Sequence, residues 1–529
     1  MKTWQDVASL YQIYPRSFRD TNGDGIGDLN GITEKLDYLA WLGVDTIWIS
    51  PFFLSPLTDF GYDIADYRAI DPTFGGLDDF RALLEKAHVL DIKVMIDLVP
   101  CHTSDQHPWF QEARSSRDNP RRNYYVWRDG RDGIEPNNWR SLSGGSSWKL
   151  DEQTDQFYLH SFLKTQPDLN WDNPAVRDEI KNVVRFWFDM GVDGMRVDAI
   201  WGISKDPEFS DDSPNPDFHS DPEAYGAFIH DHCKMGPHFQ EYLRELASVC
   251  DEYDDRQMVF EFYPDEKLGD IYQQYRQVLT AHPKASAFFM EYRQDEWHAE
   301  HTGQKIEKYL QAAGSARPFF CVGNHDQPRI ASRLGMERAR ALHFLNLLTP
   351  GVSVMYYGDE IGMINGELTA EDIQDNFSPA HSAIDSRDLE RTPMQWDDTR
   401  FAGFSEVKPW LPVNKNYTFI NVGNEKSLSA SILNLHRTLL RLRQEFPIIK
   451  NGTLNIVSSA DTGNGFILGI KRELGRERAY IFINFADAPQ SFSIPENGRI
   501  LASTHPQYLL LEKDRQMTIP GYCGVMLIH

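Results

Sequence analysis

Acidic side chains stand where three predicted strands end. The stretch GMRVDAI contains Arg196 and Asp198, VFEFYPD contains Glu261, and CVGNHDQPR contains His325 and Asp326. Each stretch begins as an apolar, β-favouring run and meets its acidic residue as that run ends. Carboxylates at the ends of successive strands of a barrel suit general acid and nucleophile chemistry on a glycosidic bond. These stretches therefore predict a chemistry as well as a fold.

The spacing that such chemistry needs is well defined. A retaining glycosidase uses a nucleophile and an acid/base whose carboxyl groups are about 5–5.5 Å apart. Asp198 at the end of a fourth strand and Glu261 at the end of a fifth could meet that geometry. The alternative is that each carboxylate only caps the helix that follows its strand. For a single Asp the cap is the more common role, but the combination with Arg196, His102 and His325 favours catalysis.

The elements that would position these residues form a regular series. Helical periodicity in segments such as 76–90 and 173–191 alternates with short apolar runs, and Asp172–Asn173–Pro174 is typical of a helix start. Near-continuous apolar runs are typical of buried parallel strands. Eight such runs predict a closed (β/α)8 TIM barrel; they are 10–15, 46–50, 93–99, 194–199, 258–263, 286–290, 318–324 and 352–358.

Two further domains are expected. Segment 102–171 is rich in Asn, Arg, Gly, Ser and Trp and is too long for an ordinary loop, so it predicts a small subdomain inserted after the third strand. Alternating short runs after a helix at 427–446 predict an antiparallel β-sandwich. The expected division is a barrel over 1–101 and 172–448, the inserted subdomain over 102–171, and the C-terminal domain over 449–529.

Composition excludes several classes of protein. The chain has 529 residues, 41% of them hydrophobic, and a formal net charge of -25. Such an acidic chain argues against nucleic acid and anionic membranes as partners. Five scattered cysteines without a CxxC pair suggest neither a disulfide framework nor a zinc site. With no apolar signal segment or membrane-length apolar window, we expect a cytoplasmic protein that is a monomer or a homodimer.

The loop DTNGDGIGD (20–28) places oxygen-bearing groups at alternate positions. Its start is similar to an EF-hand loop, but Gly31 stands where the bidentate Glu would be, so an EF-hand is excluded. The spacing still predicts a structural Ca²⁺ or Mg²⁺ site, and the alternative is an Asx/Gly-rich turn without an ion. The expected ligands are Asp20, Asn22, Asp24, Asp28 and the carbonyl of Ile26.

Three more motifs complete a family pattern: DLVPCHTS (97–104), QPDLNW (166–171) and YYGDEIGM (356–363). Over essentially its whole length the chain resembles the α-amylase family of glycoside hydrolases, in its α-glucosidase and oligo-1,6-glucosidase branch. The resemblance implies that Asp198 is the nucleophile, that Glu261 is the acid/base and that Asp326 is a third carboxylate stabilising the transition state. Arg196 would hold Asp198 ionised. Related α-glucosidases also carry a metal in the 20–28 loop, and no organic cofactor is implied.

The resemblance also implies how a sugar is held. His102 and His325 would hydrogen-bond the sugar in the cleaved subsite. In LTDFGYDIADY (57–67), Tyr62 would stack under the terminal glucose, and Asp59 would reach its outer hydroxyls with help from Arg387. That charged wall would restrict the pocket to non-reducing chain ends. The alternative is that Tyr62 only packs within its loop and that Arg387 is solvated.

The chain departs from the family pattern at two positions. Cys101 stands where Asn usually precedes the His of DLVPCHTS, which puts in doubt any anchoring of the loop or of a metal by that position. Ala199 follows the nucleophile where oligo-1,6-glucosidases typically have Val, which favours α-1,4 over α-1,6 linkages. The acidic segment 201–225 follows the same strand and is expected to border the acceptor subsites, or else to be merely a solvated loop.

These observations predict a retaining, exo-acting α-glucosidase that prefers α-1,4 bonds and releases glucose from short oligosaccharides or disaccharides. A transferase or isomerase, of the sucrose isomerase or trehalose-forming type, shares the first step and stays an alternative, as does an oligo-1,6-glucosidase. A non-catalytic protein resembling the heavy chains of amino-acid transporters is disfavoured because all three carboxylates are present. The expected partner is a small α-glucoside.

Overall fold

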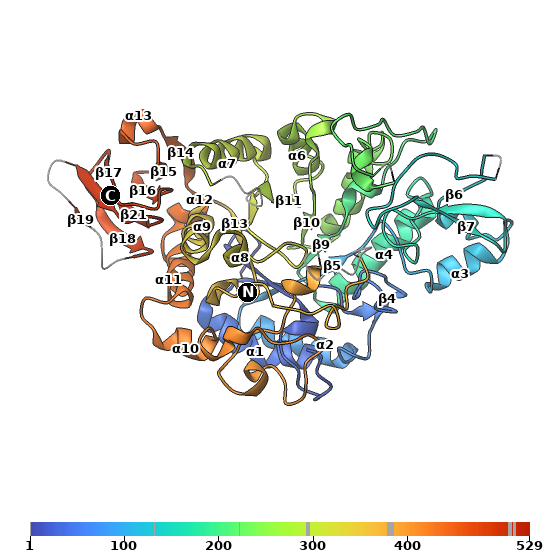
Figure 1. The fold of residues 1–529 in the computed structure, drawn as a ribbon, viewed down its shortest axis with the longest axis horizontal. Helices are drawn as coiled ribbons and strands as arrows, with labels where there is room; N and C mark the ends of the chain where they lie inside the picture. The colour runs from blue at the N-terminus through green and yellow to red at the C-terminus, as the bar shows by residue number, and fades with distance from the viewer. Residues whose placement is uncertain are drawn as a thin grey trace.

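Eight parallel strands close into a barrel at the centre of the molecule (Figure 1). The computed structural model describes residues 2–131, 133–221, 223–291, 297–377, 386–505, 510–511 and 515–529. Each of the eight predicted runs overlaps one barrel strand, which confirms the predicted fold class. In chain order the strands are β1 (Ser9–Ile13), β2 (Thr46–Ile49), β5 (Lys93–Leu98), β9 (Gly194–Val197), β10 (Gln257–Phe260), β11 (Ala285–Phe289), β12 (Phe319–Cys321) and β13 (Val352–Tyr356).

The strands are apolar because both of their faces are covered. Nearly every residue of the eight strands is buried, with side chains filling the barrel on one face and packing against helices on the other. The register aligns neighbouring strand ends: Asp97 on β5 pairs with Arg196 on β9, and Val197 pairs with Phe260 on β10. Side chains that follow β5, β9 and β10 therefore emerge at one end of the barrel.

Helices follow the strands and surround the barrel. The larger ones are α1 (Leu29–Leu42), α2 (Leu77–Val89), α4 (Pro174–Met190), α5 (Phe239–Ala247), α6 (Ile271–Leu279), α7 (Ala299–Ala313), α9 (Met336–Leu348) and α11 (Ile432–Glu445). The side chain of Asn173 accepts a hydrogen bond from the Ala175 amide and caps α4, as the Asp-Asn-Pro sequence predicts. The helix predicted at 427–446 starts later, because Ser431 caps it by accepting from the Asn434 amide.

Two smaller units lie at opposite ends of the barrel domain (Figure 1). The chain after β5 forms α3 (Pro108–Ser115) and a sheet of β6 (Trp127–Arg128), β8 (Gln156–Leu159) and β7 (Trp148–Asp151). At the other end a five-stranded antiparallel sheet runs β14 (Thr453–Val457), β15 (Ile467–Leu474), β16 (Glu477–Asn484), β21 (Gly524–Ile528) and β18 (Arg499–Ser503), beside a three-stranded sheet of β17 (Gln490–Ser493), β20 (Gln516–Ile519) and β19 (Leu510–Leu511).

The two C-terminal sheets share one apolar core. Phe482 on β16, Phe492 on β17 and Met517 on β20 belong to the same cluster of buried side chains. The rings of Phe482 and Phe492 are 4.8 Å apart between centroids. Because these side chains come from both sheets, the domain is the antiparallel sandwich that the alternating runs predict.

Candidate active site

A pocket of about 430 Å³ opens at the end of the barrel where β9 and β10 finish. All three predicted catalytic carboxylates line it, together with predicted sugar-binding residues, whereas the 20–28 loop does not. The lining residues are Asp59, Tyr62, His102, Leu142, Phe162, Asp198, Ala199, Trp201, Tyr225, Lys234, Glu261, Tyr263, Asp326, Gln327, Phe377 and Arg387. The structure thus brings together residues that are more than 300 positions apart in the sequence.

Arg196 is the centre of the carboxylate cluster. Its side chain is fully buried, and its Nη1 lies 2.5 Å from Asp97 Oδ1 and 2.6 Å from Asp198 Oδ1. Its Nη2 lies 2.5 Å from Glu261 Oε1. The Asp198 amide still bonds to the Leu98 carbonyl at 2.8 Å, so this side chain leaves the barrel just where the strand pairing ends. Asp198 and Glu261 therefore contact separate nitrogens of one guanidinium, and neither side chain caps a helix.

One guanidinium faces three carboxylates, so the cluster carries excess negative charge. Burial raises the pKa of Asp198 well above its usual range, and the nearby Glu261 and Asp97 add to the rise while Arg196 opposes it. Burial likewise raises the pKa of Asp97, to about 6, against the opposing effect of Arg196. Like charges this close favour retention of a shared proton at neutral pH. Such a cluster can supply both a general acid and an ionised nucleophile.

A second set of contacts orients His325. Its Nδ1 lies 2.7 Å from the amide nitrogen of Gln12, which can only donate, so the ring proton is on Nε2. Nε2 is 2.7 Å from Tyr62 Oη, and the two rings are parallel with centroids 5.3 Å apart. Burial holds the pKa of His325 well below its usual range. The imidazole is therefore neutral and directs its Nε2–H at Tyr62 Oη, and His325 is fully buried and does not itself line the pocket.

Asp326 is ionised by its neighbours. Arg391 Nη2 lies 2.8 Å and Arg387 Nη1 lies 3.3 Å from Asp326 Oδ1. Burial alone would raise the pKa of Asp326, but His325, Arg391 and Arg387 lower it below its usual range. The carboxylate stays negative at neutral pH, which suits it to accept hydrogen bonds from hydroxyl groups and to face a developing positive charge.

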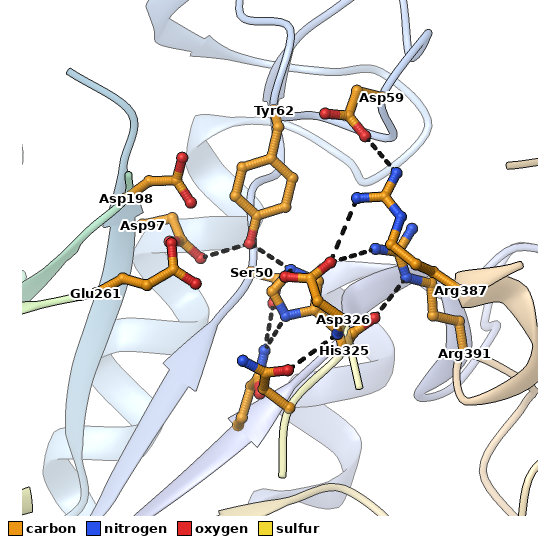
Figure 2. A network of polar contacts seen from close by, with 12 residues as sticks. Ser50, Asp59, Tyr62, Asp97, Asp198, Glu261, His325, Asp326, Arg387 and Arg391 are labelled. Atoms are coloured by element: carbon orange, nitrogen blue, oxygen red, sulfur yellow. Dashed lines mark hydrogen bonds and ion pairs between the residues drawn. The ribbon is translucent and has the colours of Figure 1, made fainter. Parts of the chain in front are cut away.

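A charged wall closes the pocket beside Tyr62. Arg387 Nη2 bonds to Asp59 Oδ1 at 2.7 Å (Figure 2). Asp375 accepts from the same guanidinium at 2.7 and 2.9 Å. Gln166 donates to Asp59 Oδ2 at 3.0 Å. Only 17% of the Arg387 side chain is exposed, so the alternative of a solvated arginine is wrong.

His102 lies on the remaining side of the pocket. Its Nε2 is 3.0 Å from the Tyr62 carbonyl, and its buried Nδ1 has no hydrogen-bond partner in the described part of the chain. Burial lowers the pKa of His102, so the ring is neutral. Because the Tyr62 carbonyl can only accept, the ring proton is on Nε2.

The residue after Asp198 has an unusual backbone. Ala199 adopts φ 44° and ψ 42°, in the left-handed region, and its amide donates to Glu261 Oε2 at 3.2 Å. Beneath it the Cys101 thiol packs so closely that a Cβ on Gly202 would meet Sγ at 2.6 Å. Cys101 is thus a buried packing residue. Trp201 and Tyr225 line the pocket, so segment 201–225 does border it and is not merely solvated.

The 20–28 loop lies outside the pocket, and its oxygens make internal hydrogen bonds. Asp28 caps α1 by accepting from the Gly31 amide at 2.7 Å, and Asp20 accepts from Gly23 and Gly25. Asp24 is exposed, and its Oδ1 accepts from the Ile26 amide at 2.8 Å. Carboxylate oxygens can accept further contacts. The donor set consists of oxygens only, and it therefore fits Ca²⁺ or Mg²⁺.

Four residues of the site had no assigned role in the sequence. Asp97 lies in the DLVPCHTS motif and contacts Arg196, and Arg391 lies four residues after Arg387 and contacts Asp326. Gln12 on β1 orients His325, and Asp375 in the loop after β13 orients Arg387. The signal for Asp97 was its position at the end of a strand, whereas Gln12 and Asp375 had no local signal.

Comparisons with known proteins agree with this geometry. The family model described as "Alpha amylase, catalytic domain" matches residues 12–452. An oligo-1,6-glucosidase of Parageobacillus thermoglucosidasius is 38% identical, covering 94% of this chain and 93% of that one. A probable alpha-glucosidase of Rhizobium meliloti is 38% identical over 93% of this chain and 91% of its own.

Solved structures extend the comparison to the whole fold. The alpha-glucosyl transfer enzyme XgtA superposes with a TM-score of 0.90 at 35% identity, and the match covers 100% of both chains. The trehalulose synthase MutB of Pseudomonas mesoacidophila MX-45 superposes with a TM-score of 0.88 at 36% identity, again over 100% of both.

Proposed function

The chain belongs to the α-amylase family and is a glycoside hydrolase, and we propose that it acts as a retaining, exo-acting α-glucosidase. Its substrates would be short oligosaccharides or disaccharides, from which it releases a terminal α-glucose. One observation carries the proposal: Arg196 holds Asp198 and Glu261 together in a pocket that the Asp59–Arg387 ion pair closes. A closed pocket admits only a chain end.

The reaction has two displacements. In the first, Asp198 attacks the anomeric carbon while Glu261 donates a proton to the glycosidic oxygen, so the C–O bond breaks and a glucosyl-enzyme ester forms. In the second, Glu261 takes a proton from water, which attacks the same carbon and releases glucose with its configuration retained. The proton that the crowded carboxylates share would reside on Glu261 when substrate is bound. Arg196 would stabilise the carboxylate of Asp198.

The other residues would bind and orient the sugar. Tyr62 would stack under the terminal glucose, and His102 and His325 would bond to its hydroxyls. Ionised Asp326 would bind hydroxyl groups and stabilise positive charge at the anomeric centre in the transition state. Support comes from the neutral, pre-oriented His325 ring and from the two arginines on Asp326.

We propose that α-1,4 bonds are preferred over α-1,6 bonds. Ala199 leaves more room beside the nucleophile than a Val would, and its methyl group lies in the pocket wall. One or two methyl groups discriminate by about 1–3 kcal/mol, so the preference is expected to be moderate.

Transfer to a sugar acceptor is a second candidate. XgtA and trehalulose synthase are similar over the whole chain, and both are named for glucosyl transfer or isomerised products. Trp201, Tyr225 and Phe377 line this pocket, and aromatic side chains of this kind can bind an acceptor sugar. Transfer would need only a sugar hydroxyl in place of water in the second displacement.

Three further features belong to the proposal. A structural Ca²⁺ or Mg²⁺ would bind in the loop through Asp20, Asn22, Asp24, Asp28 and the carbonyl of Ile26. The five cysteines are free and buried, which suits a reducing cytoplasm. The oligomeric state would be a monomer or a homodimer. Among the described residues, no helix is long and apolar enough to cross a bilayer.

The nucleophile can be tested by chemical rescue. Asp198→Ala should abolish glucose release from 4-nitrophenyl α-glucoside, and azide should restore turnover as the β-glucosyl azide. Asp178→Ala, on the exposed face of α4, is the matched control and should keep wild-type activity. Near wild-type glucose release by Asp198→Ala would refute the mechanism. For the wild-type protein, identifying the products formed from maltose, isomaltose, sucrose and trehalose would distinguish hydrolysis from transfer.

A further inference from the structure

Three side chains with metal-binding atoms meet in the segment that joins β9 to α5. Asp212, His230 and Cys233 are all buried, and Oδ2, Nδ1 and Sγ lie within 4.8 Å of one another. His230 Nδ1 is 3.4 Å from Asp212 Oδ2 and 3.5 Å from Cys233 Sγ. None of the three lines the pocket, so they are separate from the proposed catalytic residues.

The surrounding hydrogen bonds leave these three atoms facing one another. Asp212 Oδ1 accepts from the backbone amides of His232 at 2.8 Å and Cys233 at 3.1 Å. His230 Nε2 is 2.9 Å from the Tyr225 carbonyl, which can only accept, so Nε2 carries a proton, and in the neutral tautomer Nδ1 carries the lone pair. These hydrogen bonds therefore fix the orientation of the Asp212 carboxylate and of the His230 ring.

Lys234 contributes positive charge nearby, but within the described ranges no lysine or arginine forms an ion pair with Asp212. The lone pair of His230 Nδ1 faces a carboxylate oxygen, and the single thiol proton of Cys233 can satisfy only one of these two acceptors. Asp212 Oδ2 is buried, and within the described ranges no N–H group donates to it, so the Cys233 thiol is its one available donor there. An unsatisfied buried carboxylate oxygen is costly. A cation between the three atoms would satisfy all of them at once.

We propose that Asp212, His230 and Cys233 bind a Zn²⁺-type divalent ion. Zinc bonds are about 2.3 Å long to sulfur and about 2.0–2.1 Å long to nitrogen and oxygen. In a tetrahedral site these lengths place sulfur and nitrogen ligands about 3.5 Å apart, and nitrogen and oxygen ligands about 3.4 Å apart. The corresponding distances here are 3.5 and 3.4 Å. Thiolate and imidazole ligands favour zinc over Ca²⁺ or Mg²⁺. The fourth position is left for water.

The outer contacts fit the same assignment. A zinc-binding imidazole usually donates its other N–H to a carbonyl or a carboxylate, as His230 does to Tyr225. The Tyr225 and His230 rings are also stacked, 3.7 Å apart between centroids. Tyr225 and Lys234, which directly follows Cys233, both line the pocket. The ion would therefore fix one wall of the pocket and act structurally rather than in the chemical steps.

The binding test uses Co²⁺ as a spectroscopic probe on the full-length protein. Chelator-treated protein is titrated with Co²⁺, followed by Zn²⁺. We expect one Co²⁺ per chain with a thiolate-to-metal charge-transfer band in the near ultraviolet, loss of that band as Zn²⁺ displaces Co²⁺, and a higher Tm with Zn²⁺. A titration without stoichiometric binding, or without a thiolate band, overturns the proposal. An ion in the 20–28 loop would give no such band, because that loop offers only oxygens.

Variants assign the ligands. Cys233→Ser should remove the band, and Asp212→Asn should weaken Zn²⁺ binding at least about tenfold. Asn at 212 keeps an oxygen for the two backbone amides, so the segment can stay folded. Cys523→Ser is the control, because its buried Sγ already lies 3.6 Å from Ser503 Oγ and it should keep the band. Persistence of the band in Cys233→Ser would refute the assignment.

Discussion

Replacing Asp97 by Asn tests whether the shared negative charge of the cluster sets the acidity of the proposed acid. Asp97 and Asp198 lie 2.5 and 2.6 Å from the same Arg196 nitrogen, so the two oxygens are no more than about 5 Å apart. At an effective dielectric constant of about 20, two charges at that separation repel by about 3 kcal/mol, or about 2 pKa units. With a pKa of about 6, Asp97 is mostly ionised at pH 7.

Removing this charge lets Arg196 act more strongly on Asp198 and Glu261, which lowers the pKa of the shared proton. We expect the alkaline limb of the kcat/KM profile to move down by about 1–2 pH units. At pH 7 the rate on maltose should fall about tenfold, whereas 4-nitrophenyl α-glucoside, whose leaving group needs little protonation, should be less affected. The assay is the pH dependence of kcat/KM for both substrates.

A purely structural effect is distinguished by the shape of the profile. Asp97 accepts from Arg196 through Oδ1 and from the Trp48 indole at 2.8 Å through Oδ2. The NH₂ group of Asn would face one of these two donors, and this mismatch costs about 1–3 kcal/mol of stability. That cost would lower the rate evenly at all pH values. Asp359→Asn is the matched control, since Asp359 is buried with a pKa of about 7 beside Arg329 but does not line the pocket. An alkaline limb that does not move in Asp97→Asn would refute the reasoning.

Three further predictions follow from other parts of the molecule. Ala199→Val should shift the ratio of kcat/KM values toward isomaltose by about 1–3 kcal/mol and should also lower the Tm, because a β-branched residue is strained at φ 44°; an unchanged ratio would assign linkage choice to the neighbouring loops. In chelator-treated protein, added Ca²⁺ should raise the Tm more than it raises kcat because it would bind the oxygens of the 20–28 loop, and Asp24→Ala should show no such rise; an unchanged wild-type Tm counts against this ion. Although burial opposes it, Arg387 lowers the pKa of Asp375 to about 2, so the stability that this carboxylate contributes is present above about pH 4 and is lost as the pH falls toward 2. Asp375→Asn should remove about 2–3 kcal/mol at neutral pH and flatten the Tm between pH 4 and 2, and a Tm curve parallel to that of the wild type would contradict this.

The sequence by itself determined the barrel, the sandwich and the three carboxylates, because these depend on local periodicity and on motifs that end strands. Eight apolar runs with helices between them have one common solution, and Asp198, Glu261 and Asp326 follow from their positions at the strand ends. The cap of α4 by Asn173 could also be predicted from the local sequence. The start of α11 is set by the side-chain cap of Ser431, which a periodic pattern does not locate.

Only the tertiary structure decided the electrostatics of the site and the cluster outside it. Asp97, Gln12 and Asp375 act on partners that lie between 12 and 313 positions away, and no local pattern encodes which side chain a fold will place opposite another. The sequence suggested no zinc site because the cysteines form no CxxC pair. The third proposed ligand, Asp212, is brought to His230 and Cys233 only by the folding of the loop between them. Ligand geometry is a property of atoms in space, and folding, not spacing along the chain, creates it.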